Sequence, residues 1–508
     1  MSMQDKKILL MYPPGALYQR GEDRCKSNIE TSSASSTRSC NDLGYAAAVL
    51  RTAGYEPRIR DYQTAGYDQV RSLSDIYNYQ PDLIMISVVD ASIADDLVFI
   101  QKIKERFQDS FSLTGHTSAR GAANKIPTII LKGALFFNAP DYLLEQFDFS
   151  SADYLIGGEV DQSIAHIANR VFGKLGSAES IPGILYRDAD GTFYKTSFTS
   201  SHRNLDELPF PARDLMDLSL YTRPDTGEPM ATIQTSRGCY GTCSLCKTPK
   251  IAGTKVIFRR PESVFAEIEE CYYTHGIKTF FFKADTFTSN EQWIHRLCDL
   301  IIASDLAGKI SFAANSRVKP LQKATLQCMK DAGCFVIAFS YDSGSDETLK
   351  KIRKGAETAD NLRAANWARQ IGLPVYGFFV IGYPWEAKAL LAQTRRHIFK
   401  LNPDYLEIHI ALPYWGTQLQ VLHSQSGTLE DYAVNQPVFM DNFESSITGV
   451  RTITIRQLRN YRKYTLLAFY MRPKYLYSRL VPTIKNPRAT LSYIRYGWKL
   501  ISNLLRGK

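Results

Sequence analysis

The sequence predicts an α/β protein with two parallel sheets, one following the other along the chain. Short apolar and β-branched runs alternate with helical patterns over residues 1–175, and the same alternation returns after residue 229. Runs of this kind are typical of strands that are covered on both faces, and their alternation with helices favours parallel sheets. A chain of 508 residues is also too long for one hydrophobic core, so at least two domains are expected.

Residues 1–175 are predicted to form a doubly wound sheet. Its strands are expected at Lys7–Tyr12, Pro57–Asp61, Asp82–Val88, Pro127–Leu131 and Asp153–Ile156. Helical segments such as Asn41–Ala53 and Ile93–Phe107 lie between them, and the polar stretch Asp109–Lys125 is interpreted as a surface insertion. Ligands of such sheets bind at the carboxyl ends of the strands. Those ends lead into the loops that begin at Pro13, Val89, Lys132 and Gly157.

Residues 176–228 are expected to be an irregular linker, because prolines interrupt them repeatedly. Residues 229–425 return to the alternation. Their strands are expected at Met230–Thr235, Thr279–Lys283, Ser311–Asn315, Val336–Tyr341, Val375–Ile381 and Tyr405–Ala411. The helices between them include Ser263–Thr274, Glu291–Ala303 and Lys319–Ala332. Six β/α units in series predict a partial or full barrel, with its chemistry at the carboxyl ends of the strands.

The remaining residues, 426–508, form a basic C-terminal region. The chain has a net charge of +10, yet residues 445–508 alone hold fourteen Lys and Arg and no Asp or Glu, so the rest is slightly acidic. No apolar run is long enough to span a bilayer, and the first residues do not resemble a signal peptide. The nine cysteines are odd in number and three of them are crowded together, which argues against a secreted disulfide framework. We therefore expect a cytoplasmic protein.

Three cysteines lie in the loop that follows the first strand of the predicted barrel. The segment runs Thr235-Ser-Arg-Gly-Cys239-Tyr-Gly-Thr-Cys243-Ser-Leu-Cys246. A structural zinc site normally has four protein ligands, and no fourth cysteine or histidine lies nearby in the sequence. A four-iron cubane held by only three cysteines would leave one iron open for chemistry. Zinc binding, or three inert thiols, is the alternative interpretation.

This Cys-x3-Cys-x2-Cys loop resembles the signature of the radical S-adenosylmethionine (SAM) superfamily. The resemblance implies a [4Fe–4S] cluster bound by Cys239, Cys243 and Cys246, with SAM chelated by the fourth iron. It also implies that an electron from the cluster cleaves SAM to a 5′-deoxyadenosyl radical. An external electron donor such as flavodoxin or ferredoxin would supply that electron.

Later segments of the barrel are similar to strand ends of the same superfamily. These segments are Phe281–Thr288, Ala332–Cys334 with Phe339–Ser345, Gly377–Glu386 and Pro413–Thr417. Asp342 stands where the common pattern has Glu, which is longer by one methylene. The resemblance implies that SAM is bound by residues on these segments and beside them, namely Tyr240, Asp285, Ser316, Arg317, Asp342, Gly382 and Pro384.

A doubly wound domain before such a barrel resembles the cobalamin-dependent class of this superfamily. Asp42–Leu50 and Gly54–Pro57 match its first helix and second strand. On this resemblance the expected cobalamin contacts are Gly133, Gly157, Gly158 and Glu159.

The first domain departs from that class in two places. The usual Asp-x-His-x-x-Gly motif is absent, since no histidine precedes His116, and the loop Lys132–Leu135 lacks the commoner Gly-Gly pair. Cobalamin would then bind with water or with no lower ligand. A degenerate domain that only shapes the substrate site is the alternative.

Together these resemblances imply a cobalamin-dependent methyltransferase that acts on an unactivated carbon. An oxidative or ring-forming enzyme, like the anaerobic magnesium-protoporphyrin monomethyl ester cyclase, is an alternative because it shares this architecture. A non-catalytic cobalamin- or metal-binding sensor is the third hypothesis.

The end of the chain has the pattern of an amphipathic helix. Leu491, Ile494, Trp498, Ile501 and Leu505 share one helical face, and the basic residues fall on a separate stripe. This arrangement favours either contact with an anionic membrane surface, which hints at a lipid-like substrate, or packing against the barrel. No nucleic-acid partner is expected, since no recognised binding fold accompanies the charge.

The six other cysteines are not expected to bind the metal. Four of them lie in or beside helical patterns and are predicted to be buried thiols: Cys271, Cys298, Cys328 and Cys334. Cys25 and Cys40 lie near the ligand edge of the first sheet, where a functional role is open.

Overall fold

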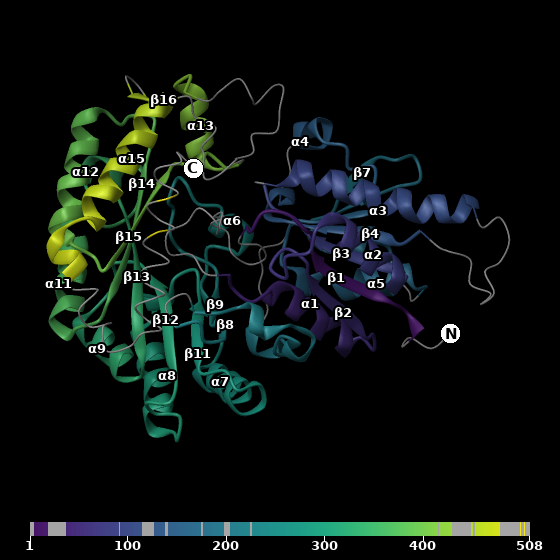
Figure 1. The fold of residues 1–508 in the computed structure, drawn as a ribbon, viewed down its shortest axis with the longest axis horizontal. Coiled ribbons are helices and arrows are strands. Elements are labelled where there is room, and N and C mark those ends of the chain that lie inside the picture. Colours follow the sequence, from purple (N-terminus) through teal and green to yellow (C-terminus); the bar gives the residue numbers. More distant parts are fainter. Residues whose placement is uncertain are drawn as a thin grey trace.

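The computed structural model contains two lobes, each built on one sheet (Figure 1). The purple and blue lobe holds the first sheet, and the green lobe holds the second. The structure describes residues 5–18, 37–90, 92–113, 126–137, 141–173, 176–197, 204–223, 226–414, 416–428, 449–450 and 453–477, with Trp498 and Ser502.

The first sheet has seven strands in the order β2-β1-β3-β4-β5-β6-β7. They are β1 (Ile8–Tyr12), β2 (Pro57–Asp61), β3 (Leu83–Ser87), β4 (Thr128–Lys132), β5 (Tyr154–Ile156), β6 (Ile184–Arg187) and β7 (Phe193–Lys195). The first five are parallel and follow the flavodoxin-like order 2-1-3-4-5. The predicted strands agree with these five to within one residue at each end.

Helices connect the strands of the first sheet and cover it. They are α1 (Asn41–Thr52), α2 (Gln69–Tyr79), α3 (Ile93–Leu113), α4 (Asp141–Gln146) and α5 (Ile164–Val171). Two apolar clusters lie on the two faces of the sheet, because alternate residues of each strand point to opposite sides. The prediction of a surface insertion from Asp109 is wrong at its start, since α3 continues to Leu113; residues 114–125 lie outside the described residues.

The expected linker 176–228 is irregular only in part. β6 and β7 lie within it and add an antiparallel hairpin to the edge of the first sheet beside β5. The hairpin is short, and its turn contains Gly191 with a φ of +90°. From residue 204 the described part of the segment forms short 3₁₀ turns, η5 (Leu205–Glu207), η6 (Arg213–Leu215) and η7 (Leu218–Leu220).

The second sheet has six parallel strands in the order β15-β14-β13-β12-β11-β8. They are β8 (Met230–Gln234), β11 (Thr279–Lys283), β12 (Ser311–Ser316), β13 (Cys334–Asp342), β14 (Val375–Ile381) and β15 (Tyr405–Ile410). β8 and β15 lie at opposite edges of the sheet. The sheet is therefore open, as a partial barrel is, and each predicted strand agrees with it to within two residues.

The second sheet is covered by helices on its outer face (Figure 1). They include α7 (Pro261–His275), α8 (Glu291–Ala303), α9 (Lys323–Asp331), α11 (Thr358–Ile371) and α12 (Lys388–Leu401). The shorter helices are α6 (Thr248–Ile251), α10 (Asp346–Lys351) and α13 (Gln418–Gln425). The prediction of a helix from Lys319 is wrong by four residues, because Pro320 disfavours helical geometry at the residue before it.

The basic C-terminal region contains the helix α15 (Ile455–Tyr470), which lies beside β15 (Figure 1). A short antiparallel pair, β16 (Gly449–Val450) and β17 (Ile453–Thr454), precedes it. Among the described residues, none of the helices is both long and apolar enough to cross a bilayer. The predicted amphipathic helix near Trp498 lies almost entirely outside the described residues.

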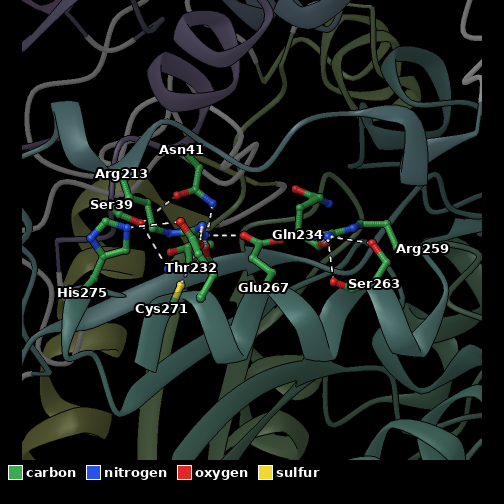
Figure 2. Close-up of polar contacts among 11 residues, drawn as sticks. Ser39, Asn41, Arg213, Thr232, Gln234, Arg259, Ser263, Glu267, Cys271 and His275 are labelled. Carbon is green, nitrogen blue, oxygen red and sulfur yellow. Dashed lines mark hydrogen bonds and ion pairs between the residues drawn. The ribbon is translucent and has the colours of Figure 1, made fainter. Parts of the chain in front are cut away.

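Both edges of the open sheet are capped by side chains. On β8, the Thr232 N–H donates to Ser39 Oγ (3.1 Å), and the Thr232 carbonyl accepts from Asn41 Nδ2 (2.7 Å) and Arg213 Nη2 (3.1 Å; Figure 2). On β15, the Tyr470 hydroxyl bonds to both the N–H (2.8 Å) and the carbonyl (2.7 Å) of Leu406. Backbone groups at a strand edge need such partners when they are buried.

A buried ion network holds the segment before β8 against α7 (Figure 2). Glu267, on α7, lies between Arg213 and Arg259 and is paired with both, and all three side chains are at most 4% exposed. Burial alone would raise the pKa of Glu267, but the two arginines hold that pKa below its usual value. Glu270 lies 3.3 Å from Arg213, and Arg259 also donates to the carbonyl of Gln234 (3.0 Å).

We expect Glu267→Gln to lower the free energy of unfolding by about 3–5 kcal/mol, because it leaves two buried arginines without their carboxylate. The matched control is Glu262→Gln on the same helix, which breaks the exposed pair with Arg296 (side chains 50% and 56% exposed). That control should leave the free energy of unfolding nearly unchanged, because water screens exposed ion pairs. Urea unfolding of the two variants measures the difference. Equal midpoints would contradict the role given to the network.

Candidate functional site

The cysteine loop lies at the carboxyl end of the second sheet, directly after β8. It is held by the antiparallel pair β9 (Ser236–Arg237) and β10 (Ile257–Phe258) and by α6. The Cys239 N–H donates to the Gly253 carbonyl (3.0 Å), and the Gly238 N–H donates to Asp285 Oδ2 (2.8 Å). Gly238 has a φ of +93°, and a Cβ there would lie 2.1 Å from the Lys255 oxygen, so the turn requires glycine. Contacts within the protein thus fix the loop.

Each of the three thiols accepts one hydrogen bond from an N–H group. The pairs are Gly241 N–H with Cys239 Sγ (3.3 Å), Thr248 N–H with Cys246 Sγ (3.3 Å) and Arg317 Nη1 with Cys243 Sγ (3.5 Å). Donors of this kind stabilise thiolates and the iron–sulfur clusters that thiolates hold. Three sulfur ligands with one donor each are a set that fits a [4Fe–4S] cluster.

Burial acts on these thiols in the opposite direction to the donors. It raises the pKa of Cys239, while the Gly241 N–H and Arg317 lower it, and it raises the pKa of Cys246, while Thr248 lowers it. Iron ligation would replace the proton, since a metal-bound thiol is deprotonated. In the part of the chain that the structure describes, no group of three His, Cys, Asp or Glu side chains could hold a single metal ion.

Arg317 approaches the cysteine loop from the end of β12. Its Nη2 donates to the Lys354 carbonyl, and its guanidinium lies 5.9 Å from the ring centroid of Tyr240, which is 45% exposed. A Cβ at residue 241 would lie 2.9 Å from Arg317 Nη1, so Gly241 leaves room for the guanidinium. Ser316 bonds instead to Thr288 and to the Arg317 carbonyl (2.7 Å). The structure therefore brings Arg317 and Tyr240 to the cysteine loop.

Asp342 forms a buried ion pair with Lys354, a residue that the sequence analysis missed. Lys354 Nζ lies 2.6 Å from Asp342 Oδ2 and donates to Ser340 Oγ (2.9 Å), which in turn donates to Asp342 Oδ1 (2.6 Å). Asp342 has a φ of +60°, an unusual value for a residue other than glycine. No sequence pattern links Lys354 to the site, because its role depends on this backbone conformation.

The segment after β14 forms a tight turn around Glu386. The fully buried carboxylate accepts from the N–H groups of Gly382 (2.6 Å) and Tyr383 (3.2 Å). Burial raises the pKa of Glu386 to about 7, although the two N–H groups lower it. Gly382 has a φ of +94°, and Pro384 follows within the turn. The Tyr383 hydroxyl is buried and has no hydrogen-bond partner among the residues that the structure describes.

The inner face of the second sheet is accessible to solvent, whereas its outer face is buried under helices. Residues alternate between buried and half-buried along β12 and β14. The half-buried set includes Lys283, Asn315, Ala338, Tyr376, Phe378 and His409. Tyr376 donates to Glu407, and Arg38 from the first lobe lies 3.9 Å from the ring of Phe281 on this face. The inner face of the second sheet therefore carries aromatic and polar side chains, and one residue of the first lobe contacts it.

Asp42 joins the carboxyl ends of three strands in the first sheet. It accepts from Tyr12 at the end of β1 (2.5 Å), from Ser87 at the end of β3 (2.9 Å) and from Lys132 at the end of β4 (3.1 Å). Asp42 is 1% exposed and Lys132 is 7% exposed. The ligand edge of a doubly wound sheet is thus organised around one buried carboxylate.

The three glycines among the expected cobalamin contacts differ in how much space surrounds them. A Cβ on Gly133 would lie 2.8 Å from the Val88 oxygen, and one on Gly157 would lie 2.4 Å from the Phe137 nitrogen. These two glycines let neighbouring loops pack together. Gly158 has nothing closer than 3.9 Å to such a Cβ, so it leaves space for a ligand. Of these three glycines, Gly158 is therefore the one whose Cα faces open space among the described residues.

Glu159 and the loop that follows it connect this edge to the cysteine loop. Glu159 lies 3.9 Å from Arg237 Nε, and Asp161 in η3 (Val160–Gln162) accepts from Arg237 Nη1 (2.9 Å). Arg237 is 2% exposed and precedes Cys239 by two residues. The carboxyl ends of the two sheets therefore face each other.

The remaining cysteines are largely inert by position. Cys271, Cys298 and Cys334 are at most 5% exposed, as predicted, whereas Cys328 is only half-buried. Cys40 is fully buried beside the Tyr221 hydroxyl (3.1 Å), and burial raises its pKa well above the usual value. Cys25 lies outside the described residues.

Sequence comparison relates this chain to known enzymes. Residues 233–391 match the family model described as the radical SAM superfamily. An uncharacterised methyltransferase of Pyrococcus horikoshii is 27% identical over 77% of this chain and 85% of its own length. The cytidylyl-2-hydroxyethylphosphonate methyltransferase of Streptomyces wedmorensis is 24% identical over 75% of this chain and 73% of its own length. The anaerobic magnesium-protoporphyrin IX monomethyl ester cyclase of Cereibacter sphaeroides is 24% identical over 61% of this chain and 51% of its own length.

Solved structures share the whole architecture. The radical SAM methyltransferase TsrM from Kitasatospora setae aligns over 99% of both chains, with a TM-score of 0.65 and 14% identity. The cobalamin-dependent SAM radical enzyme OxsB aligns over 99% of this chain and 72% of its own, with a TM-score of 0.68 and 15% identity. At this identity the likeness shows the fold alone, an α/β fold with parallel sheets.

The match to the family model begins within β8 and includes all three cluster cysteines. Members of the superfamily use a [4Fe–4S] cluster and SAM. The three thiols and their N–H donors fit such a cluster. The chain therefore contains a radical SAM domain, and the proteins to which it is similar include methyltransferases and the anaerobic magnesium-protoporphyrin ester cyclases.

Proposed function

We propose that this enzyme is a cobalamin-dependent methyltransferase that transfers a methyl group to an unactivated carbon. The observation that carries the proposal is the contact between the two carboxyl edges. Arg237, beside the cysteine loop, pairs with Asp161 at the ligand edge of the first lobe (2.9 Å). A cofactor at that edge and a cluster on the loop would both border the accessible inner face of the second sheet.

The residues of the loop would hold the cluster, and the neighbouring turn would bind SAM. When bound, the cluster supplies the electron that cleaves SAM. Cys239, Cys243 and Cys246 supply the sulfur ligands, and three N–H groups stabilise them. The proposed SAM contacts remain Tyr240, Asp285, Ser316, Arg317, Asp342, Gly382 and Pro384. Of these, Asp285 also fixes the loop through the Gly238 N–H.

The first lobe would hold cobalamin at its strand ends. When bound, cobalamin carries the methyl group between SAM and the substrate. Gly158 leaves room there, and Gly133 and Gly157 allow the loops to pack closely. Glu159 lies next to Gly158 and reaches toward Arg237. The absence of histidine before His116 supports binding without an axial histidine from the loop after β1.

Ring formation is the second candidate, and it rests on the relationship to the Cereibacter sphaeroides cyclase. Its supporting observation in this chain is the aromatic inner face, where the rings of Phe378 and His409 stack at 6.1 Å. A non-catalytic sensor role is the third candidate.

We also propose that the enzyme is cytoplasmic and receives its electrons from flavodoxin or ferredoxin. We propose further that its basic C-terminal region contacts membranes peripherally and that its substrate is a lipid-like molecule. The exposed side chains of Tyr464 (60%), Met471 (51%) and Tyr477 (71%) on and after α15 support this contact, since Arg and Lys accompany them. Sedimentation with anionic vesicles, compared with zwitterionic ones, tests it.

Replacement of any one cluster cysteine by alanine should abolish the broad absorption near 400 nm that such clusters show, after anaerobic reconstitution. A triple variant should bind no [4Fe–4S] cluster, because the loop is then without thiolates. Iron and sulfide analysis measures this. Cobalamin binding should survive in all variants, since it depends on the first lobe. A triple variant that still holds four irons would contradict the assignment of the cluster to these three cysteines.

Turnover with SAM labelled in its methyl group should place the label in the product and release 5′-deoxyadenosine. The label follows from methyl transfer, while 5′-deoxyadenosine follows from the radical step. Mass spectrometry of product and nucleoside measures both. 5′-Deoxyadenosine without label in the product would favour the ring-forming alternative. A reduced cluster that cleaves no SAM would leave only the sensor hypothesis.

Glu386→Gln should remove one component of the pH dependence of stability. The folded pKa is about 7, above the usual 4.5, so wild type loses stability as pH rises from 4.5 to 7. Below pH 4.5 the folded and unfolded states both bind the proton, so this group does not affect stability. Above pH 7 both states are ionised, and the buried charge lowers the free energy of unfolding by a constant amount, on the order of 3 kcal/mol. The amide keeps one oxygen for both N–H groups.

Urea midpoints at pH 5 and pH 8 measure this effect. The Gln variant should gain stability relative to wild type at the higher pH, and the exposed control Glu347→Gln should not. A difference between wild type and Glu386→Gln that stays constant with pH would refute the assignment.

A further inference from the structure

Arg317 differs from the other two donors to the cluster thiols. Cys239 and Cys246 accept from backbone N–H groups, which are neutral and which no side-chain substitution removes. Cys243 accepts from a guanidinium, which carries a full positive charge, at 3.5 Å. Charge-assisted hydrogen bonds are roughly twice as strong as neutral ones. Of the three thiols, Cys243 is thus the one that accepts its hydrogen bond from a charged group, and the same guanidinium also acts on Cys239 through its charge.

The guanidinium is held in this position from several sides. Its Nη2 donates to the Lys354 carbonyl, and the Lys354 side chain is fixed by Asp342 at 2.6 Å and Ser340 at 2.9 Å. Its Nε is buried and, within the described part of the chain, has no hydrogen-bond partner. Gly241 leaves the space that the group needs. A long side chain held this closely would lose little further freedom when a cluster binds.

Reduction adds one negative charge to a cluster and its thiolates. A fixed positive charge stabilises the reduced form more than the oxidised form, and an N–H donor to sulfur acts in the same direction. Removal of the charge should therefore make the cluster harder to reduce. This effect does not require SAM to be present.

We propose that Arg317 is a positioning residue that raises the reduction potential of the cluster through its hydrogen bond and charge at Cys243. The proposal rests on the cluster assigned under the proposed function and adds to it. The expected role of Arg317 as a SAM contact makes a different prediction, since a ligand contact changes SAM affinity and leaves the SAM-free potential unchanged.

The test is a redox titration of the reconstituted cluster without SAM, followed by its absorbance and its electron paramagnetic resonance signal. Arg317→Met removes the charge and both hydrogen bonds at similar length. Arg317→Lys keeps the charge but cannot reach Cys243 and the Lys354 carbonyl in the same way. Arg353→Met is the matched control, because Arg353 is exposed and adjoins Lys354 in the same loop.

We expect the midpoint potential to fall in Arg317→Met, to fall less in Arg317→Lys and to stay at the wild-type value in Arg353→Met. If Arg317→Met takes up no cluster, the Arg317→Lys variant decides the question. The midpoint potential of its cluster must then be lower than that of wild type. Unchanged potentials in Arg317 variants with full iron content would overturn the proposal, even if SAM affinity fell. A wild-type protein that binds no cluster would instead overturn the proposed function.

Discussion

The second sheet does not close on itself, and this constraint organises the rest of the molecule. An open sheet leaves a row of backbone N–H and carbonyl groups at each edge, and buried groups of this kind need partners. The edge of β8 obtains them from Ser39, Asn41 and Arg213, which belong to the first lobe and the segment that follows it. The edge of β15 obtains them from Tyr470 on α15.

The charges of the interface follow from the same constraint. Arg213 can serve the β8 edge only if its own charge is neutralised, because an unpaired buried guanidinium is very costly. Glu267 on α7 neutralises this charge and also pairs with Arg259. Arg259 in turn donates a hydrogen bond to the carbonyl of Gln234, two residues further along β8. Helix α7 therefore supports the strand that leads into the cysteine loop.

The sequence predicted the strands well because buried parallel strands are continuous apolar runs, such as Leu83–Ser87 and Thr279–Lys283. It missed the β6–β7 hairpin because strands of four and three residues do not show a clear period. The three cysteines could be assigned because their spacing is local. Lys354 could not, since its pairing with Asp342 depends on a backbone conformation, and Glu267 could not, since its partners lie 54 and 8 residues away.

The pairing of Arg237 with Asp161 has a consequence for how the enzyme is matured. Arg237 lies in β9, two residues before Cys239, and Asp161 belongs to the other lobe, so this ion pair couples the position of the cysteine loop to docking of the lobes. Coupling of two binding events is reciprocal, which means that iron–sulfur loading favours docking as much as docking favours loading. Cells that deliver clusters to this protein would thus act on its assembly as well as on its chemistry. An enzyme starved of iron would be looser between its lobes, and more open to proteases, than one that is merely inactive.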